Sequence, residues 1–259
     1  MSDTRPIALF DSGIGGLSIL LKIKKKLPYE NLIYFADQAY FPYGTKSDSQ
    51  LYRRSKKISE FLFTKNIKML IVACNTATLH TVSTLRIKSQ IPIVGVVPAI
   101  KTASQQKSKK IGIMATQSTF KSKNFKNLVD KFANNKEIIR INCNGLEKAI
   151  EKNNVMEIRR ILKKSLPPVK KSKIDTIVLG CTHYPLIKNE IKKITGSGVK
   201  IIDSHSAIAK RVSNLLKFHN SYSSTKKTET FFTTGKVGEF SKIASSLLKY
   251  KVIAEAAKI

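Results

Sequence analysis

Short apolar runs alternate with amphipathic segments along this chain, and the alternation predicts an α/β fold. Runs rich in β-branched residues are typical of buried parallel strands, and in the first third of the chain they cover residues 7–10, 32–36, 69–73 and 91–96. Segments with helical apolar periodicity lie between them and cover residues 17–26, 49–65 and 75–89. Strands that alternate with helices indicate a mainly parallel sheet with helical layers.

The same pattern returns further along the chain at an offset of 104 to 107 residues. The strand-like runs pair as 7–10 with 111–114, 31–35 with 137–141, 69–73 with 176–180, and 91–96 with 198–202. Loop residues repeat together with the strands, which favours an ancient duplication into two pseudo-symmetric α/β units, although strand–helix alternation by itself is the other explanation. If the units face each other, a site in the cleft between them is expected.

We predict a first domain of residues 1–98 plus 207–259 and a second domain of residues 99–206. A Pro-Pro pair at Pro167 and Pro168 predicts a break before the third strand of the second unit. The remaining segments predict a helix at 204–218, a Ser/Lys linker at 220–227, a strand at 229–234 and a helix at 237–251. This tail is too small to be a domain and is expected to pack on the first unit.

Two of the three cysteines follow predicted strands at matching positions of the repeat. Cys74 comes after residues 69–73, and Cys181 comes after residues 176–180. Small hydroxyl and amide residues follow each thiol and favour a helix N-cap, so both thiols are predicted at a strand end and a helix start, where open α/β sheets bind ligands. A helix N-terminus lowers the pKa of a thiol. Cys143 lacks this context and is predicted to be a core residue.

Duplicate bases without a cofactor suit one reaction in particular, which is racemisation. One thiol removes a proton from one face of a carbon while the other returns a proton to the opposite face. A hydrolase triad would instead need one nucleophile and one base. Other candidates have structural alternatives: Asp11 and Ser12 as helix caps, Tyr43 as a turn residue, and His183 as a structural histidine rather than a general acid beside a thiol.

The net charge of +30 raises a different hypothesis, a surface for nucleic acid or another polyanion. The basic residues, 39 Lys and 8 Arg, avoid the motif segments at 28–44, 69–85 and 174–187 and crowd into predicted helix faces and loops. Base readout favours Arg, so we expect a solvated lysine coat without specific nucleic-acid binding. Three cysteines without CxxC spacing argue against a disulfide scaffold or a metal cage, and no run is long enough to cross a membrane. We expect a cytoplasmic protein.

Four segments taken together resemble the signature segments of the glutamate racemase family, within the cofactor-independent aspartate/glutamate racemase superfamily. They are Asp11-Ser12-Gly13-Ile14-Gly15-Gly16, Pro42-Tyr43-Gly44, Cys74-Asn75-Thr76 and Gly180-Cys181-Thr182-His183-Tyr184-Pro185. The resemblance covers about residues 7–205 and implies a two-domain α/β enzyme that interconverts L- and D-glutamate without a cofactor or metal. The D-glutamate would serve peptidoglycan synthesis, and hence cell-wall biogenesis and cell shape.

The resemblance also implies roles for individual residues. Cys74 would act on D-glutamate and Cys181 on L-glutamate, assisted by Asp11 and His183. Substrate contacts are implied for Asp11, Ser12, Tyr43, Gly44, Asn75, Thr76, Thr182 and His183, and supporting positions for Asp37, Glu151, Thr116 and Thr119.

Two departures and two alternatives accompany the resemblance. Asn144-Gly145 stands where relatives carry Pro, which affects the segment leading to Glu151, and Gln38-Ala39-Tyr40-Phe41 replaces a stretch that usually carries Arg. An aspartate or hydantoin racemase is an alternative with the same fold, and a basic nucleic-acid-binding protein is an alternative of another class. A homodimer is compatible with the sequence but is not determined by it.

Overall fold

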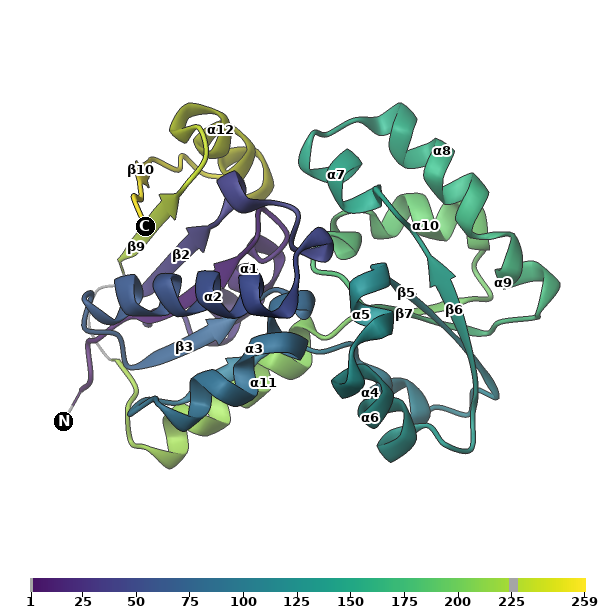
Figure 1. Cartoon of the computed structure of the whole chain (residues 1–259), viewed down its shortest axis with the longest axis horizontal. Coiled ribbons are helices and arrows are strands. Elements are labelled where there is room, and N and C mark those ends of the chain that lie inside the picture. The colour runs from purple at the N-terminus through teal and green to yellow at the C-terminus, as the bar shows by residue number, and fades with distance from the viewer. Residues whose placement is uncertain (1, 224–227) are drawn as a thin grey trace. The chain divides into compact units, whose positions relative to one another are not determined.

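The computed structural model describes residues 2–223 and 228–259. They form two compact units, one made of the residues up to Val96 together with His205–Ile259, the other of Val97–Ser204 (Figure 1). The second unit therefore begins and ends two residues earlier than the predicted range of 99–206. Residues 224–227 of the predicted linker lie outside the described residues.

Among the described residues, the first unit forms a six-stranded, all-parallel sheet in the order β10-β9-β2-β1-β3-β4. Its strands are β1 (Ile7–Asp11), β2 (Leu32–Ala36), β3 (Met69–Val72), β4 (Ile93–Gly95), β9 (Glu229–Thr233) and β10 (Ala254–Ala256). The pairing of β9 with β2 confirms that the tail returns to the first unit. The three-residue β10 was not predicted, because so short a run carries no periodicity.

Helices cover both faces of this sheet, which explains why β1, β2 and β3 are buried along their whole length. Helix α1 packs against α11 and α12, and α2 packs against α3. These elements, with two short 3-10 helices after β2, are α1 (Leu17–Lys26), η1 (Gln38–Tyr40), η2 (Tyr43–Thr45), α2 (Asp48–Phe63), α3 (Asn75–Ile87), α11 (His205–Phe218) and α12 (Val237–Leu248). A capping box of Ser47 and Gln50 begins α2.

The described part of the second unit forms a four-stranded parallel sheet in the order β6-β5-β7-β8. Its strands are β5 (Lys110–Ala115), β6 (Glu137–Asn142), β7 (Thr176–Leu179) and β8 (Lys200–Ile202). Numbered within each unit, the four strands that the repeat predicts have the same order in both sheets, namely second, first, third, fourth. This result confirms the predicted α/β fold of two pseudo-symmetric units with parallel sheets.

Most helices of the second unit are shorter than those of the first. They are α4 (Ile100–Ser104), α5 (Gln117–Lys121), α6 (Lys123–Phe132), α7 (Leu146–Glu151), α8 (Val155–Ser165), α9 (Pro167–Lys171), η3 (Tyr184–Ile187) and α10 (Lys188–Thr195). The predicted break at Pro167 lies between α8 and α9. Both prolines occupy the first positions of α9, where a missing N–H leaves no hydrogen bond unmade.

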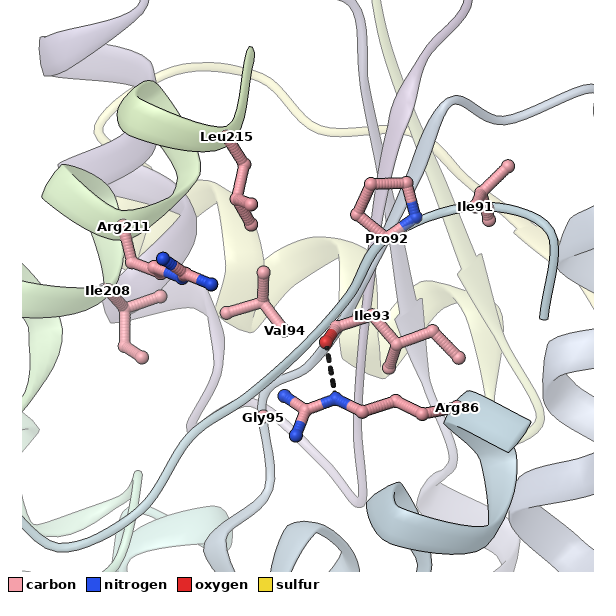
Figure 2. Close-up of a pocket in the computed structure, with 9 residues that line it drawn as sticks. All are labelled: Arg86, Ile91, Pro92, Ile93, Val94, Gly95, Ile208, Arg211 and Leu215. Carbon is pink, nitrogen blue, oxygen red and sulfur yellow. Dashed lines mark hydrogen bonds between the residues drawn. The ribbon is translucent and has the colours of Figure 1, made fainter. Parts of the chain in front are cut away.

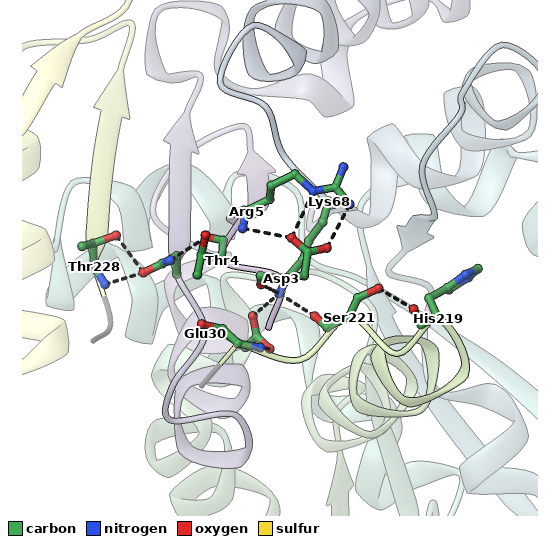
Figure 3. A network of polar contacts seen from close by, with 10 residues as sticks. Asp3, Thr4, Arg5, Glu30, Lys68, His219, Ser221 and Thr228 are labelled. Atoms are coloured by element: carbon green, nitrogen blue, oxygen red, sulfur yellow. Dashed lines mark hydrogen bonds and ion pairs between the residues drawn. The ribbon is translucent and has the colours of Figure 1, made fainter. Parts of the chain in front are cut away.

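A buried lysine, Lys68, forms an ion pair inside the first unit and also binds the N-terminal segment (Figure 3). Lys68 Nζ lies 2.6 Å from Glu30 Oε2, with side chains only 1% and 2% exposed. The same ammonium donates to the backbone oxygens of Asp3 and Ser221, each at 2.6 Å. Lys68 is thus an exception to the lysine coat. None of the described helices has the length and hydrophobicity that a membrane span needs.

Candidate active site

Cys74 lies where the sequence predicts it, directly beyond β3 and at the N-cap of α3. The residue is 6% exposed and forms no disulfide. The helix start places partial positive charge and unpaired N–H groups near the thiol, and this environment favours a thiolate.

A hydroxyl and a carboxylate at the end of β1 form a chain of hydrogen bonds with this thiol. Since β1 and β3 are neighbours in the sheet, their carboxyl ends lie side by side. Cys74 Sγ donates to Ser12 Oγ at 3.9 Å, and Ser12 Oγ donates to Asp11 Oδ1 at 3.4 Å. The N–H of Gly13 holds the same carboxylate oxygen at 3.0 Å. The alternative assignment of Asp11 as a helix cap is wrong, because Gly16 is the N-cap of α1.

Gly16 allows α1 to begin against the strand ends. A Cβ at this position would lie 2.9 Å from the Tyr34 hydroxyl and 3.0 Å from the Cβ atoms of Ala73 and Asp11. The Tyr34 hydroxyl in turn donates to the backbone oxygen of Gly13 at 2.7 Å. Any side chain at position 16 would therefore displace the loop that carries Asp11.

Tyr43 lies in the same hydrophobic cluster as Cys74, at the start of η2, and is 1% exposed. Its hydroxyl donates to Asp37 Oδ2 at 2.7 Å. Burial raises the pKa of Tyr43 well above its usual value, and the negative charges of Asp37 and Cys74 raise it further. Tyr43 is therefore a neutral donor at any physiological pH, close enough to the thiol to sense its charge. Gly44 follows it within η2.

Two partners of Asp37 were missed by sequence reasoning. Arg54 on α2 donates Nε to Asp37 Oδ2 at 2.8 Å and Nη2 to Oδ1 at 2.6 Å. Thr234, beyond β9, donates its hydroxyl to Asp37 Oδ1 at 2.9 Å. The assignment of Arg54 to a solvated basic coat is wrong, since its side chain is only 15% exposed. The sequence carried only a chemical clue to Arg54, which is that a buried carboxylate requires a cationic partner. No pattern of positions along the chain pointed to Arg54 itself.

Asn75 and Thr76 occupy the first turn of α3, 3% and 5% exposed. The buried Oδ1 of Asn75 has no hydrogen-bond partner within the part of the chain that the structure describes. A buried acceptor of this kind is unusual in a native protein, and it is accounted for when a ligand supplies the donor.

A separate cavity of about 440 Å³ lies in the first unit between β4 and α11, and none of the candidate residues lines it (Figure 2). Arg86, at the end of α3, donates Nε to the backbone oxygen of Ile93 at 2.9 Å and thereby ties α3 to β4. Burial, and then the charge of Arg211, lower the pKa of Arg86. The hydrogen bond between Arg86 and Ile93 thus fixes the C-terminal end of α3, the helix whose N-cap is Cys74.

Cys181 lies beyond β7 at the position equivalent to Cys74, but the prediction of a helix start there is wrong. A turn follows the thiol, in which the N–H of Tyr184 donates to the backbone oxygen of Cys181 at 3.2 Å. The 3-10 helix η3 comes next, and α10 begins only at Lys188. Pro185 explains the difference, since it has no N–H to donate to the backbone oxygen of Cys181, which is the bond that would open an α-helix there. Cys181 therefore lacks the helix N-terminus that lies at Cys74, and its electrostatic partner is a side chain.

His183 is that partner. Its Nδ1 lies 3.9 Å from Cys181 Sγ, and its Nε2 lies 2.7 Å from Glu151 Oε2, at the end of α7. Burial alone would lower the pKa of His183, but hydrogen bonds and charge from Cys181 and Glu151 outweigh it and raise that pKa well above its usual value. The imidazole is therefore cationic at neutral pH and places a positive charge beside Cys181. The altered segment at Asn144 does not prevent Glu151 from reaching the histidine.

The remaining candidates of the second unit are buried near strand ends. Thr116 caps α5: its Oγ1 accepts from the N–H of Thr119 at 3.4 Å and donates to Thr119 Oγ1 at 3.2 Å. Thr182 is 3% exposed beside Cys181. Cys143 is a fully buried core residue, as predicted, and burial raises its pKa to about 12.

Each unit thus presents one thiol linked to a proton-carrying group and a carboxylate. The order is thiol, hydroxyl, carboxylate in the first unit and thiol, imidazole, carboxylate in the second. Of these groups, thiols and imidazoles are the ones that serve as acids and bases near neutral pH. Among the described residues, no three His, Cys, Asp or Glu side chains cluster as a metal site requires.

Comparison with known proteins identifies the class of protein. The Asp/Glu/Hydantoin racemase family matches residues 18–212 of the chain. The glutamate racemase of Clostridium perfringens is 40% identical over 226 residues, which are 86% of this chain and 87% of that protein. The chain belongs to the Asp/Glu/Hydantoin racemase family and is an isomerase.

Solved structures agree with this assignment. Glutamate racemase isoform RacE1 of Bacillus anthracis superposes with a TM-score of 0.91 at 31% identity, covering 99% of this chain and 98% of that one. The Francisella tularensis glutamate racemase in complex with D-glutamate gives 0.87 at 30% identity, with coverage of 99% and 98%. The Escherichia coli enzyme in complex with L-glutamate and the activator UDP-MurNAc-ala gives 0.85 at 32% identity, with 97% of each chain covered.

Proposed function

We propose that this protein is a glutamate racemase that uses Cys74 and Cys181 as its two bases. The thiolate of one cysteine removes the α-proton of glutamate, and the thiol of the other donates a proton to the opposite face of the same carbon. One C–H bond breaks and one forms, no electrons leave the substrate, and the protonation states of the two cysteines are exchanged. In the proposed assignment, Cys181 takes the proton from L-glutamate and Cys74 takes it from D-glutamate.

The observation that carries this proposal is the equivalent placement of the two thiols. Each follows the third strand of a sheet in which the strands of the unit have the same order. Duplicated bases are what a reaction needs when it must run equally well from either enantiomer. Relatives named glutamate racemase, two of them solved with D- or L-glutamate, support glutamate as the substrate.

The proposed contacts follow from the chemistry of an amino acid. The unpaired Oδ1 of Asn75 is suited to accept from the α-ammonium group. Hydroxyls and N–H groups of Ser12, Thr76 and Thr182 are suited to bind carboxylates, as are the backbone N–H groups at Gly44. Asp11 and His183 assist the two thiols through the contacts described above, while Asp37 and Glu151 support them.

The product D-glutamate would supply peptidoglycan synthesis, and the enzyme would act in the cytoplasm without a cofactor. The test is incubation with L-glutamate in deuterated water with nothing else added. We expect the circular dichroism of the amino acid to decay to zero while deuterium enters the α-position, and the same from D-glutamate. Decay with aspartate but not glutamate would reassign the substrate, and no exchange with either would refute the proposal.

A further inference from the structure

Asp37 presents a carboxylate with no exposed surface, and four hydrogen bonds converge on it. Oδ2 accepts from Tyr43 and from Arg54 Nε, while Oδ1 accepts from Arg54 Nη2 and from Thr234. Removing a carboxylate from water costs several kcal/mol unless a cation and hydrogen bonds replace its hydration. The planar guanidinium of Arg54 supplies the cation and reaches both oxygens at once.

Two further contacts hold the guanidinium of Arg54 in place. Its guanidinium carbon lies 5.3 Å from the centre of the Tyr40 ring, and Nη1 donates to the backbone oxygen of Ile259 at 3.2 Å. Hydrogen bonding and charge from Asp37 raise its pKa. Arg54 and Asp37 together thus join the segment from Asp37 to Tyr43 to the segment after β9 and to the residues beyond β10.

We propose that Arg54 is a positioning residue of the site around Cys74. Through Asp37, Arg54 fixes Tyr43 and the turn that carries Gly44 beside the thiol. The inference rests on the function proposed above, because it concerns how that site holds glutamate. Arg54 acts only through Asp37.

Removal of this cation leaves the carboxylate of Asp37 as an uncompensated buried charge. The turn that carries Tyr43 and Gly44 must then move to let water reach the carboxylate. The hydrogen bonds from Tyr43 and Thr234 remain, but both donors are neutral and supply no countercharge.

The experiment compares Arg54→Met with Arg53→Met, which removes the same charge from an exposed neighbour on α2. Values of kcat and KM for glutamate are measured for the parent and both variants. For Arg54→Met we expect kcat/KM to fall about 10- to 100-fold, mainly through KM, since displacing a substrate-holding group by about 1 Å costs this much. Equal values for the two variants would overturn the proposal.

The double variant Asp37→Asn/Arg54→Met separates positioning from general stability. It leaves no buried charge at this position, and Asn can accept from Tyr43, so we expect it to recover about tenfold of the loss. Failure to recover would refute the route through Asp37. If Arg54→Met is insoluble, Arg54→Lys, which keeps a cation but cannot reach both carboxylate oxygens in a bidentate way, is compared with Arg53→Lys, and equal KM values for these two variants would refute the positioning role. Inactivity of the parent and of Arg53→Met would instead refute the proposed function, and this inference with it.

Discussion

The contact between Glu151 and His183 allows a sharp test of how the second thiol is activated. Glu151→Gln keeps the shape of the side chain and removes its charge. In the parent protein, the Cys181 and Glu151 contacts raise the pKa of His183 against the effect of burial, so the imidazole is protonated through the neutral range. The substitution leaves burial in place and removes the carboxylate that opposes it.

The size of the effect follows from the two distances. A hydrogen bond to a charged group contributes about 1.5–3 kcal/mol, so replacing the carboxylate at 2.7 Å by a neutral amide should lower the pKa of His183. An imidazolium 3.9 Å from the thiolate sulfur stabilises it by about 4 kcal/mol at an effective dielectric constant of 20. Cys181 is partly exposed, so we expect a loss of about 10- to 100-fold in kcat/KM once the imidazole is neutral.

The assay follows racemisation by circular dichroism from pH 6 to pH 9.5. In Glu151→Gln, kcat/KM should fall as pH rises through the lowered pKa of His183 and should return toward the parent value below it. Because the enantiomers have equal free energy, kcat/KM must fall equally from L- and D-glutamate. Glu157→Gln, at an exposed ion pair on α8, is the matched control. If the two variants have the same pH profile, the proposed role of the imidazolium is wrong.

Four further predictions follow from the two units. Cys74→Ala or Cys181→Ala should abolish racemisation in both directions, each Ser variant should lose orders of magnitude, and Cys143→Ala should stay active; near-normal turnover by either Ala variant would exclude a two-base mechanism. Lys68→Met leaves Glu30 buried and unpaired and should lower the free energy of unfolding by about 3–5 kcal/mol in urea titrations, with recovery on adding Glu30→Gln; an unchanged midpoint would contradict this. Dialysis against a chelator should leave racemisation unchanged, and zinc-dependent recovery of a lost activity would show otherwise. Duplex DNA should bind weakly, without sequence preference, and dissociate at moderate salt; selective binding at physiological salt would favour the nucleic-acid hypothesis.

The amino-acid sequence by itself determined the strands, apart from the three-residue β10, and the places of the two thiols. A parallel strand buried on both faces must be a short run of apolar, mostly β-branched residues, and such runs are visible one by one and at a constant offset. The residue that follows a strand is placed by the chain itself, so Cys74 and Cys181 could be assigned to strand ends without any tertiary information. Cys143 could likewise be assigned to the core, because it lacks the small polar context of the other two cysteines.

Only the tertiary structure decided which charged groups accompany those thiols. Asp37 meets Arg54 across 17 residues and Thr234 across 197, and His183 meets Glu151 across 32. Local patterning cannot distinguish Arg54 from its exposed neighbour Arg53, because both lie on one helix within a run of basic residues. The difference arises when the helix packs and turns one side chain toward a buried carboxylate, whose need for a cation is a property of the folded interior and not of the chain.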